Sequence, residues 1–422
     1  MLLSWLVTQL RQNKNTQALG GNIAVAALGF VNYAVLARSL TPDVFGQWVV
    51  FLAGVSLIEM LRTGLILPAL IKYTAASSHE SQKQYRQQAW WMGWAISAGL
   101  SLLLFGLGFF SVNPSFRLFF RFSPLFFLLS LPNYFIVWYY QAERDFLRLL
   151  ALRGGTFLLF TTGIIYHYFE GKDLEWVAYL YISCHGIASV AVLFAEHRKI
   201  PFSFALHRKS LQKMLHFGKY SFGTSGLMEV YKNLEIYLIG FWMGPTAAAL
   251  YHIPLKLTEG FELLLRSVIS NLYPLLASEV NQSRFGSFQR LLRKYIRFTS
   301  LLHLGVALGV FIFANWIVNL LGGPQYVNTP APALLKIVVF MYLLSPLDRL
   351  NGVALDAVER PEYNLYKMAL ALLVKGGGLW LVLQFYPGLI AVAIVSFMAH
   401  LFKALLSVYY VRKILEKYKI RI

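Results

Sequence analysis

Charged side chains lie within long apolar stretches of this sequence, where formal charge is expensive. The stretch 40–72 carries Glu59 and Arg62, three residues apart. A second apolar stretch, 243–279, carries four charges: Lys256, Glu259, Glu262 and Arg266. Ionisable residues at membrane depth mark ion or substrate pathways by default. Their residue types therefore point to binding of an ion or a charged substrate.

The spacing of these charges indicates which of them share a helix face. Residues three apart lie one turn apart, so Glu59 and Arg62 are predicted to pair along a helix. At 100° per residue, the four charges of 243–279 fall within an arc of about 120°. A further cluster within one and a half turns consists of Glu229, Lys232, Asn233 and Glu235, and Lys375 is an isolated cation in a later apolar run. One polar arc on an apolar helix is expected to face protein or water.

Two kinds of group are present, and each has its own chemistry. The cations are predicted to hold an anion such as a phosphate, since arginine offers bidentate geometry; they are Arg62, Lys232, Lys256, Arg266 and Lys375. The carboxylates are predicted to bind a coupling ion, H⁺ or Na⁺; they are Glu59, Glu229, Glu235, Glu259 and Glu262. A water-filled cavity between the first, second, seventh and eighth spans is the simplest place for both.

A structural role for these charges remains open. Buried charges also pair to hold helices together, and long cationic side chains near helix ends extend to the membrane surface. For Lys336 and Lys403, which lie within reach of a helix end, the structural and functional interpretations have equal support.

The elements that position these residues are predicted to be membrane-spanning helices. Of 422 residues, 57% are hydrophobic and 14% charged, whereas a soluble protein has about 25% charged residues. Twelve apolar runs are long enough to cross a bilayer: 16–38, 44–71, 89–111, 122–141, 149–168, 174–195, 214–242, 246–278, 296–320, 331–350, 364–385 and 387–411. The chain is thus expected to be an all-α polytopic membrane protein.

The distribution of Lys and Arg predicts the orientation. These residues concentrate in alternate connecting segments, including 196–219, and are sparse in the others. The positive-inside rule then places both termini in the cytoplasm. Because the connections are short, function is expected among the helices or at their ends.

Residues 1–200 and 201–422 are predicted to form two related six-helix bundles. Thr41-Pro42 and Gly244-Pro245 recur at an offset of 203, and Glu-Arg recurs in equivalent inner segments. Halves with an even number of spans share orientation and relate by an axis along the membrane normal.

Several classes of site are not supported by the sequence. Cys184 is the single cysteine, no Cys/His cluster has zinc-like spacing, and no Gly-rich phosphate loop occurs. No metal or cofactor is therefore expected. The net charge of +19 follows from membrane topology and predicts no nucleic-acid partner. The aromatic cluster 116–127 and Trp90-Trp91 are expected to form interfacial belts, where Arg117 and Arg121 meet lipid headgroups or cap the outer face.

Three segments resemble the polysaccharide flippases of the multidrug/oligosaccharidyl-lipid/polysaccharide (MOP) exporter superfamily. They are residues 36–75, which begin LARSLTPDVFGQW, residues 216–259, which begin HFGKYSFGTSGLMEVYKNLEIY, and residues 320–337, LLGGPQYVNTPAPALLKI. The sequence Asn233-Leu234-Glu235 differs from the common family pattern, in which an Asp often follows the Asn.

The resemblance implies a MATE-like V of two pseudo-two-fold-related bundles that works by alternating access. It implies transfer of undecaprenyl-diphosphate-linked oligosaccharide, as in O-antigen and lipopolysaccharide assembly, across a bacterial inner membrane. Coupling would use an ion gradient or membrane potential rather than ATP. The implied partners are this lipid-linked substrate, membrane lipids and glycan polymerase machinery. Arg38, in LARSL, joins the predicted substrate-binding cations on this basis.

Two other functions are weighed against a flippase. A cation-coupled multidrug exporter of the same superfamily would carry a carboxylate cluster in the first six spans, where Glu59 is the only deep acidic residue. An integral-membrane glycosyltransferase or polymerase would need a large outer loop or a carboxylate-rich site at the membrane face. Twelve spans, rather than fourteen, argue against a lipid II flippase. The sequence therefore favours a transporter over an enzyme.

Overall fold

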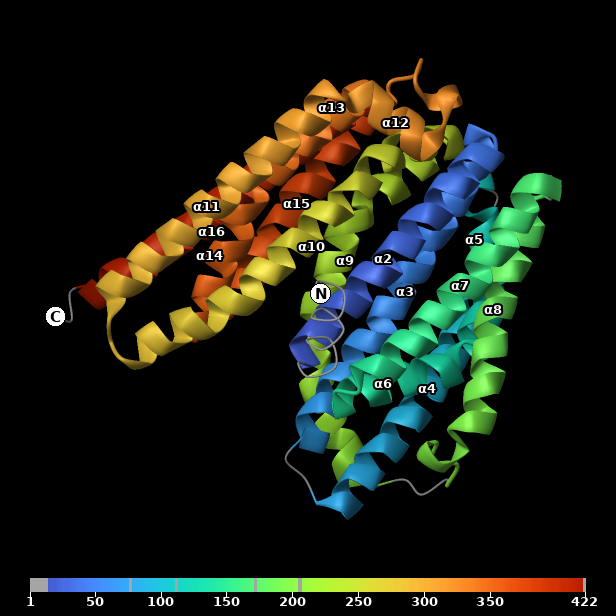
Figure 1. The fold of residues 1–422 in the computed structure, drawn as a ribbon, viewed down its shortest axis with the longest axis horizontal. Coiled ribbons are helices and arrows are strands. Elements are labelled where there is room, and N and C mark those ends of the chain that lie inside the picture. Colours follow the sequence, from blue (N-terminus) through green and yellow to red (C-terminus); the bar gives the residue numbers. More distant parts are fainter. Residues whose placement is uncertain (1–13, 76–77, 111–112, 171–172, 204–206, 420–422) are drawn as a thin grey trace, which may run out of the picture. The chain divides into compact units, whose positions relative to one another are not determined.

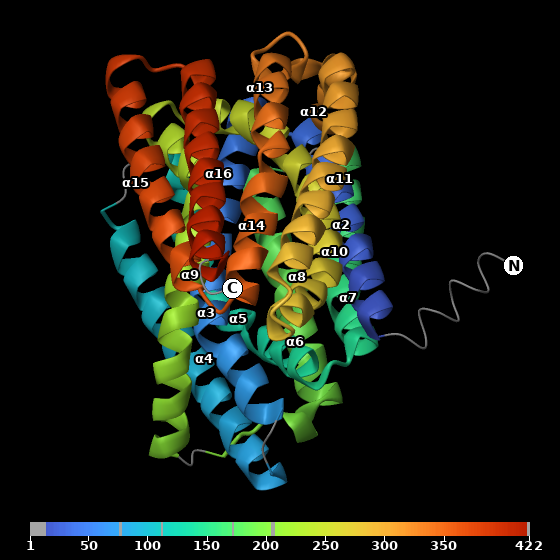
Figure 2. The same cartoon turned by 90° about the vertical axis from the view of Figure 1, so that its left-hand side faces the viewer.

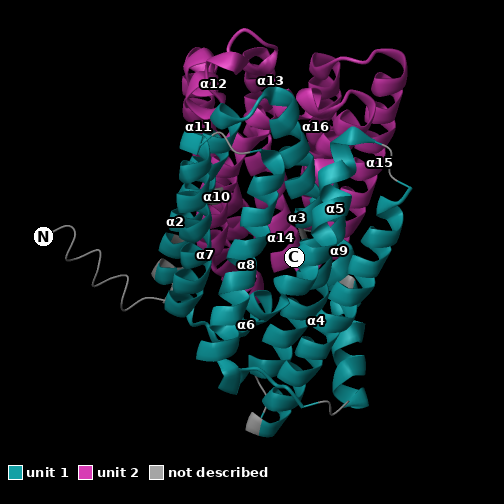
Figure 3. Ribbon diagram, turned by 90° about the vertical axis from the view of Figure 1, so that its right-hand side faces the viewer, with its two compact units in different colours: residues 1–230 teal, residues 231–422 magenta. Residues whose placement is uncertain are grey.

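The computed structural model describes residues 14–75, 78–110, 113–170, 173–203 and 207–419. Within these ranges all regular secondary structure is helical, which confirms the predicted all-α class. The chain forms two compact units, residues 1–230 and 231–422, coloured separately in Figure 3. The division falls inside one continuous helix, α9, so this helix contributes to both units.

The first unit contains the helices α2 to α8 and the first part of α9 (Figure 1). Their bounds are α2 Lys14–Ser39, α3 Pro42–Ala75, α4 His79–Gly108, α5 Pro114–Leu129, α6 Leu131–Glu143, α7 Phe146–Glu170, α8 Leu174–Ala195, the short 3₁₀ helix η1 His197–Lys199, and α9 Arg208–Trp242.

The second unit contains the rest of α9 and the helices α10 to α16. Their bounds are α10 Pro245–Asn281, α11 Phe285–Ile312, α12 Ala314–Gly322, the 3₁₀ helix η2 Pro324–Tyr326, α13 Ala331–Leu343, α14 Ser345–Ala357, α15 Glu362–Phe385 and α16 Leu389–Lys419.

Most of the predicted spans meet the physical requirements for crossing a membrane. In the described part of the chain, nine helices are long and apolar enough, and a tenth span results if α5 and α6 are counted together. The helices α9 and α10 occupy the other two predicted spans and carry several charges each. The chain is a multi-pass membrane protein, while the count of twelve spans stays a prediction.

The bend between α5 and α6 has a local cause. The two helices meet at an angle of 58° at Ser130, and Pro132 lies in the first turn of α6. Proline has no backbone N–H and favours the start of a new helix over continuation of the old one. The break places the Phe127 carbonyl and the Ser130 hydroxyl inside the first unit, where Arg62 contacts both.

In the first unit, α2 packs along α7, and α3 packs against α4, α5 and α6 (Figure 2). An apolar core joins α3, α4, α6 and α9 through buried side chains that include Ile66, Trp90, Phe135, Trp138 and Met214. Because lipid tails are as apolar as these side chains, helix association within the unit depends mainly on close van der Waals packing and on hydrogen bonds between helices.

Most of the aromatic residues that were predicted to form belts at the membrane surface are instead buried, so that prediction is wrong for them. Trp90, Phe122, Phe126 and Phe127 are buried, and Trp90 packs edge-on against Phe135. Phe126 stacks on Tyr181 of α8 at a centroid distance of 5.3 Å. These rings fill spaces between helices, which sequence composition alone does not distinguish from exposure at the membrane surface.

In the second unit, α16 packs against α13, α14 and α15, and α10 packs against α11, α13 and α14. One apolar core includes Leu272, Phe288, Leu350 and Ile414, from α10, α11, α14 and α16. These helices surround a group of buried charged side chains from α9, α14, α15 and α16.

Candidate functional site: charged side chains within each unit

Arg62 of α3 is fully buried inside the first unit, with 0% of its side chain exposed. Its guanidinium donates to Ser97 Oγ at 2.8 Å and to the Phe127 carbonyl at 3.2 Å. It also lies over the ring of Tyr134, with Cζ 4.8 Å from the ring centroid. One side chain of α3 therefore contacts α4, α5 and α6. A guanidinium can do this because it is planar and has five N–H donors in a fixed geometry.

Glu59 supplies the counter-charge for Arg62, which confirms the predicted ion pair along α3. Its other oxygen accepts a hydrogen bond from Thr63 Oγ1 at 2.7 Å. Trp138 Nε1 in turn donates to Thr63 Oγ1 at 3.1 Å. Arg62 is thus held by the protein itself, a geometry that suits a structural centre of the unit better than a phosphate-binding cation.

Glu229 belongs to the first unit through α9. Its side chain is buried and accepts a hydrogen bond from Ser56 Oγ of α3 at 2.5 Å. Ser56 lies one turn before Glu59 on α3, so α9 meets the polar side of that helix. Arg38, at the end of α2, is exposed.

Glu235 and Lys375 form a buried ion pair in the second unit, each with 1% of its side chain exposed and Nζ 2.6 Å from Oε2. Ser396 Oγ of α16 donates to the other Glu235 oxygen at 2.8 Å. Lys375 also donates to the Tyr231 carbonyl at 2.5 Å. Lys375, predicted to be an isolated cation, therefore has a partner on α9. The sequence predicts substrate binding for Lys375 and ion coupling for Glu235.

A second buried cluster, centred on Asp348 of α14, was missed by the sequence analysis. One carboxylate oxygen lies 2.7 Å from Lys367 Nζ and the other 3.1 Å from Lys403 Nζ. Ser407 Oγ donates to the same carboxylate at 2.7 Å. The three ionised side chains are at most 8% exposed. Lys403 is therefore an interior ion-pair partner, which agrees with the structural one of the two interpretations left open for it, and its side chain does not extend to the membrane surface.

Tyr231 of α9 connects the two buried clusters. Its ring centroid lies 4.2 Å from Lys375 Nζ and 4.3 Å from Lys403 Nζ. An ammonium over an aromatic face is stabilised by the ring quadrupole, more strongly when water is absent. Two carboxylates, Glu235 and Asp348, thus share the interior of the unit with three lysines.

The four charges predicted to share one arc of α10 have different partners. Lys256 Nζ contacts Glu259 at 2.8 Å, one turn along the helix. Glu262 accepts two hydrogen bonds from Arg349 of α14, at 2.9 and 3.0 Å. Arg266 is exposed and has no hydrogen bond or ion pair within the described part of the chain.

Lys232 of α9 completes this polar surface. Its side chain is exposed and, among the described residues, makes no hydrogen bond or ion pair. Its charge acts on the Glu259 carboxylate of α10. We use the name α9–α10 surface for Lys232, Lys256, Glu259 and Arg266; its exposed cations, Lys232 and Arg266, are able to receive an anionic group, whereas Lys256 is held by Glu259.

The structure therefore sorts the predicted site residues by unit. Arg38, Glu59, Arg62 and Glu229 lie in the first unit, and Lys232, Glu235, Lys256, Glu259, Glu262, Arg266 and Lys375 lie in the second. Among the described residues, no three His, Cys, Asp or Glu side chains form a group suited to a metal ion. The sequence did not single out Asp348 and Lys367, because each lies near a helix end and its partners are on other helices.

Residues 35–330 match the model of a family described as polysaccharide biosynthesis protein. The chain belongs to this family. No curated protein sequence matches the chain. The family match covers both the α3 charges and the α9–α10 surface, so these features lie in the part of the chain that the family shares.

Several solved structures have the same fold. A multidrug resistance MATE family transporter of the MOP superfamily, in an inward-facing conformation, aligns with a TM-score of 0.77 at 14% identity, covering 94% of this chain and 95% of that one. The lipid II flippase MurJ aligns at 0.72 and 13% identity, covering 95% and 89%. A MOP superfamily transporter from Pyrococcus furiosus aligns at 0.64 and 14%, covering 98% of each chain.

These likenesses establish the fold and no more, because the identities are low. The chain therefore belongs to the polysaccharide biosynthesis family and has the fold of MOP-superfamily transporters and flippases, as its sequence resemblance predicted.

Proposed function

We propose that this protein is a flippase that moves undecaprenyl-diphosphate-linked oligosaccharide across the bacterial inner membrane by alternating access, driven by an ion gradient or the membrane potential. Both termini face the cytoplasm, and the glycan polymerase machinery receives the product. The proposal rests first on membership of a polysaccharide biosynthesis family with a transporter fold.

The α9–α10 surface is the observation that carries the substrate assignment. Lys232 and Arg266 are exposed cations that make no hydrogen bond or ion pair among the described residues, and they lie on helices of a membrane protein. A diphosphate brings negative charge that such cations stabilise, with arginine able to bind it in a bidentate manner. The buried cations Arg62 and Lys375 instead keep their carboxylate partners and support the surrounding helices.

The test is transport in proteoliposomes that contain the purified chain and a fluorescent undecaprenyl-diphosphate oligosaccharide. Translocation is read from the access of an external glycosidase to the sugar. The variants are Lys232→Gln and Arg266→Gln, because Lys256→Ala would also leave Glu259 without its ion-pair partner. A charge-assisted phosphate contact contributes about 1.5–3 kcal/mol, so each variant should transport at least about ten-fold less at limiting substrate.

Arg290→Gln is the matched control, since Arg290 is an exposed arginine of α11 in the same unit. It should transport at the wild-type rate. Wild-type rates in both Lys232→Gln and Arg266→Gln would contradict the substrate assignment. Transport of cationic dyes, without transport of the lipid-linked sugar, would instead support the multidrug exporter.

A further inference from the structure

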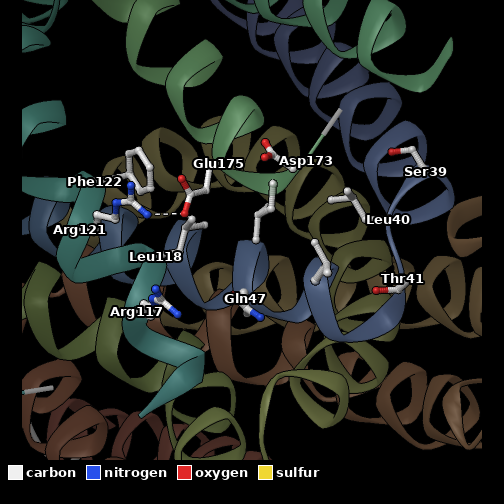
Figure 4. A pocket seen from close by; sticks show the side chains of 12 residues that line it. Ser39, Leu40, Thr41, Gln47, Arg117, Leu118, Arg121, Phe122, Asp173 and Glu175 are labelled. Carbon is white, nitrogen blue, oxygen red and sulfur yellow. Dashed lines mark hydrogen bonds and ion pairs between the residues drawn. The ribbon is translucent and has the colours of Figure 1, made fainter. Parts of the chain in front are cut away.

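A pocket of about 480 Å³ lies in the first unit, at the ends of its helices (Figure 4). Its walls come from the α2–α3 connection, the first turns of α3 and α5, and the start of α8. Its polar lining consists of Ser39, Thr41, Gln47, Arg117, Arg121, Asp173 and Glu175. The volume is within the range of about 300–1,000 Å³ that is usual for sites of small ligands. All of these residues lie outside the charged clusters described above.

Three of the four charged side chains of this pocket have a partner, and Arg117 has none among the described residues. Arg121 and Glu175 form an ion pair, drawn as a dashed line in Figure 4. Asp173 accepts a hydrogen bond from the Trp176 backbone N–H at 2.9 Å through Oδ1, so it caps α8. Arg117 is exposed and makes no hydrogen bond or ion pair in the described ranges.

The signs of the charges indicate the kind of ligand. Two arginines and two carboxylates line the pocket, so their formal charges cancel. A simple anion attracted by Arg117 would also meet the carboxylates of Asp173 and Glu175. Arg117 comes from α5 and Asp173 from the residue before α8, and Figure 4 shows them on different walls. A ligand with one negative and one positive group therefore complements both Arg117 and Asp173.

The position of the pocket indicates where such a ligand comes from. The neighbouring end of α7 carries two exposed tyrosines, Tyr166 at 52% and Tyr168 at 51%, and the end of α4 carries exposed phenylalanines. Chain connection puts these ends beside the starts of α5 and α8, which line the pocket. Tyrosine, which combines an apolar ring with a polar hydroxyl, is enriched at the level of lipid headgroups. The pocket therefore lies where phospholipid phosphates and amines are concentrated.

We infer that this pocket binds the headgroup of a zwitterionic phospholipid with a primary amine, with the phosphate at Arg117 and the ammonium at Asp173. Both contacts are charge-assisted hydrogen bonds, since the guanidinium donates to phosphate oxygens and the ammonium donates to the carboxylate. Thr41 and Gln47 supply further hydrogen-bond donors to the phosphate and glycerol oxygens. This binding is separate from the proposed transport substrate and is measured without transport.

Lipid binding is measured by native mass spectrometry of the purified full-length chain, titrated with phosphatidylethanolamine, phosphatidylcholine or phosphatidylglycerol. The variants are Arg117→Gln and Asp173→Asn. Asparagine is an equally good helix N-cap, so Asp173→Asn retains the start of α8 and removes only the charge. Arg290→Gln is again the control, as an exposed arginine far along the chain from this pocket.

Each pocket variant should bind phosphatidylethanolamine at least five-fold more weakly than wild type, while Arg290→Gln binds it equally. Phosphatidylglycerol lacks the ammonium, so its binding should be weakened by Arg117→Gln and not by Asp173→Asn. Phosphatidylcholine should bind more weakly than phosphatidylethanolamine because its quaternary ammonium donates no hydrogen bond.

Two results would overturn the inference. One is unchanged phosphatidylethanolamine affinity in both pocket variants. The other is binding of soluble O-phosphoethanolamine as tightly as of the whole lipid, which would assign the pocket to a soluble zwitterion instead of the membrane.

Discussion

Asp348 is a buried aspartate. Two lysines on two other helices balance its charge. Lys367 and Lys403 approach its separate oxygens at 2.7 and 3.1 Å, and Ser407 donates a hydrogen bond to it. Several kcal/mol are needed to desolvate each such ion, and mutual attraction offsets this only when the partners remain together. The carboxylate is thus required for the two lysines to remain inside the unit.

We predict that Asp348→Asn destabilises the protein by about 3–5 kcal/mol, because it leaves two buried ammonium groups without a counter-charge. The measurement is the free energy of unfolding in detergent, from denaturant or thermal melts of the purified protein. Ser407→Ala is the control within the same cluster. It removes one hydrogen bond and should cost only about 1 kcal/mol. Equal effects of the two substitutions would show that the charge is not what matters.

At the level of elements, α9 approaches α3 closely at Gly218 and Gly64 within the first unit. A Cβ on Gly218 would collide with the backbone carbonyl of Leu65, and one on Gly64 would lie 3.3 Å from Ser225 Cβ. Small residues allow two helix backbones to approach in a membrane protein, where van der Waals contact contributes strongly to association. The close approach also brings Ser56 of α3 within hydrogen-bond distance of Glu229.

Gly218→Ala should therefore push α9 away from α3. Because the obstacle is backbone rather than a flexible side chain, we expect a loss of about 1–3 kcal/mol of unfolding free energy. The control is Gly223→Ala on the same helix, where an added Cβ meets nothing within 4 Å. That change should be neutral or stabilise by up to ~1 kcal/mol, since alanine is the better helix former. A melt in which Gly218→Ala matched Gly223→Ala would disprove the close contact.

On the scale of the whole molecule, both units contain carboxylates, some of them buried, that contact the chain's own cations. The pairs are Glu59 with Arg62, Glu235 with Lys375, Asp348 with Lys367 and Lys403, Glu259 with Lys256, and Glu262 with Arg349. A Na⁺ ion at any of these carboxylates would have to displace an ammonium or guanidinium and leave it without a partner. Such displacement is costly in a buried site.

We predict that transport does not require Na⁺. In the proteoliposome assay, replacing Na⁺ with choline on both sides should leave the rate of sugar translocation within two-fold of the original. A protonophore or a potassium-diffusion potential then tests whether the proton gradient or the membrane potential drives transport. A ten-fold fall in rate without Na⁺ would contradict the prediction and assign a coupling role to one of these carboxylates or to Glu229, which accepts a hydrogen bond from Ser56.

The sequence by itself determined the all-helical membrane class and the pairing of Glu59 with Arg62. Both depend on local geometry: a long apolar run has to be helical in a bilayer, and residues three apart in a helix lie on one face. The resemblance in three segments also identified the superfamily that the family match and the solved structures support. These inferences needed no knowledge of how the helices pack.

Tertiary structure decided which charges belong together. Asp348, Lys367 and Lys403 lie on α14, α15 and α16, and Glu262 of α10 meets Arg349 of α14. Phe126, expected at the membrane surface, is instead buried against Tyr181. Periodicity shows which residues share a face of one helix, but not how that helix is rotated against its neighbours. Contacts between helices depend on that rotation and on the crossing distance, so only the folded chain could show them.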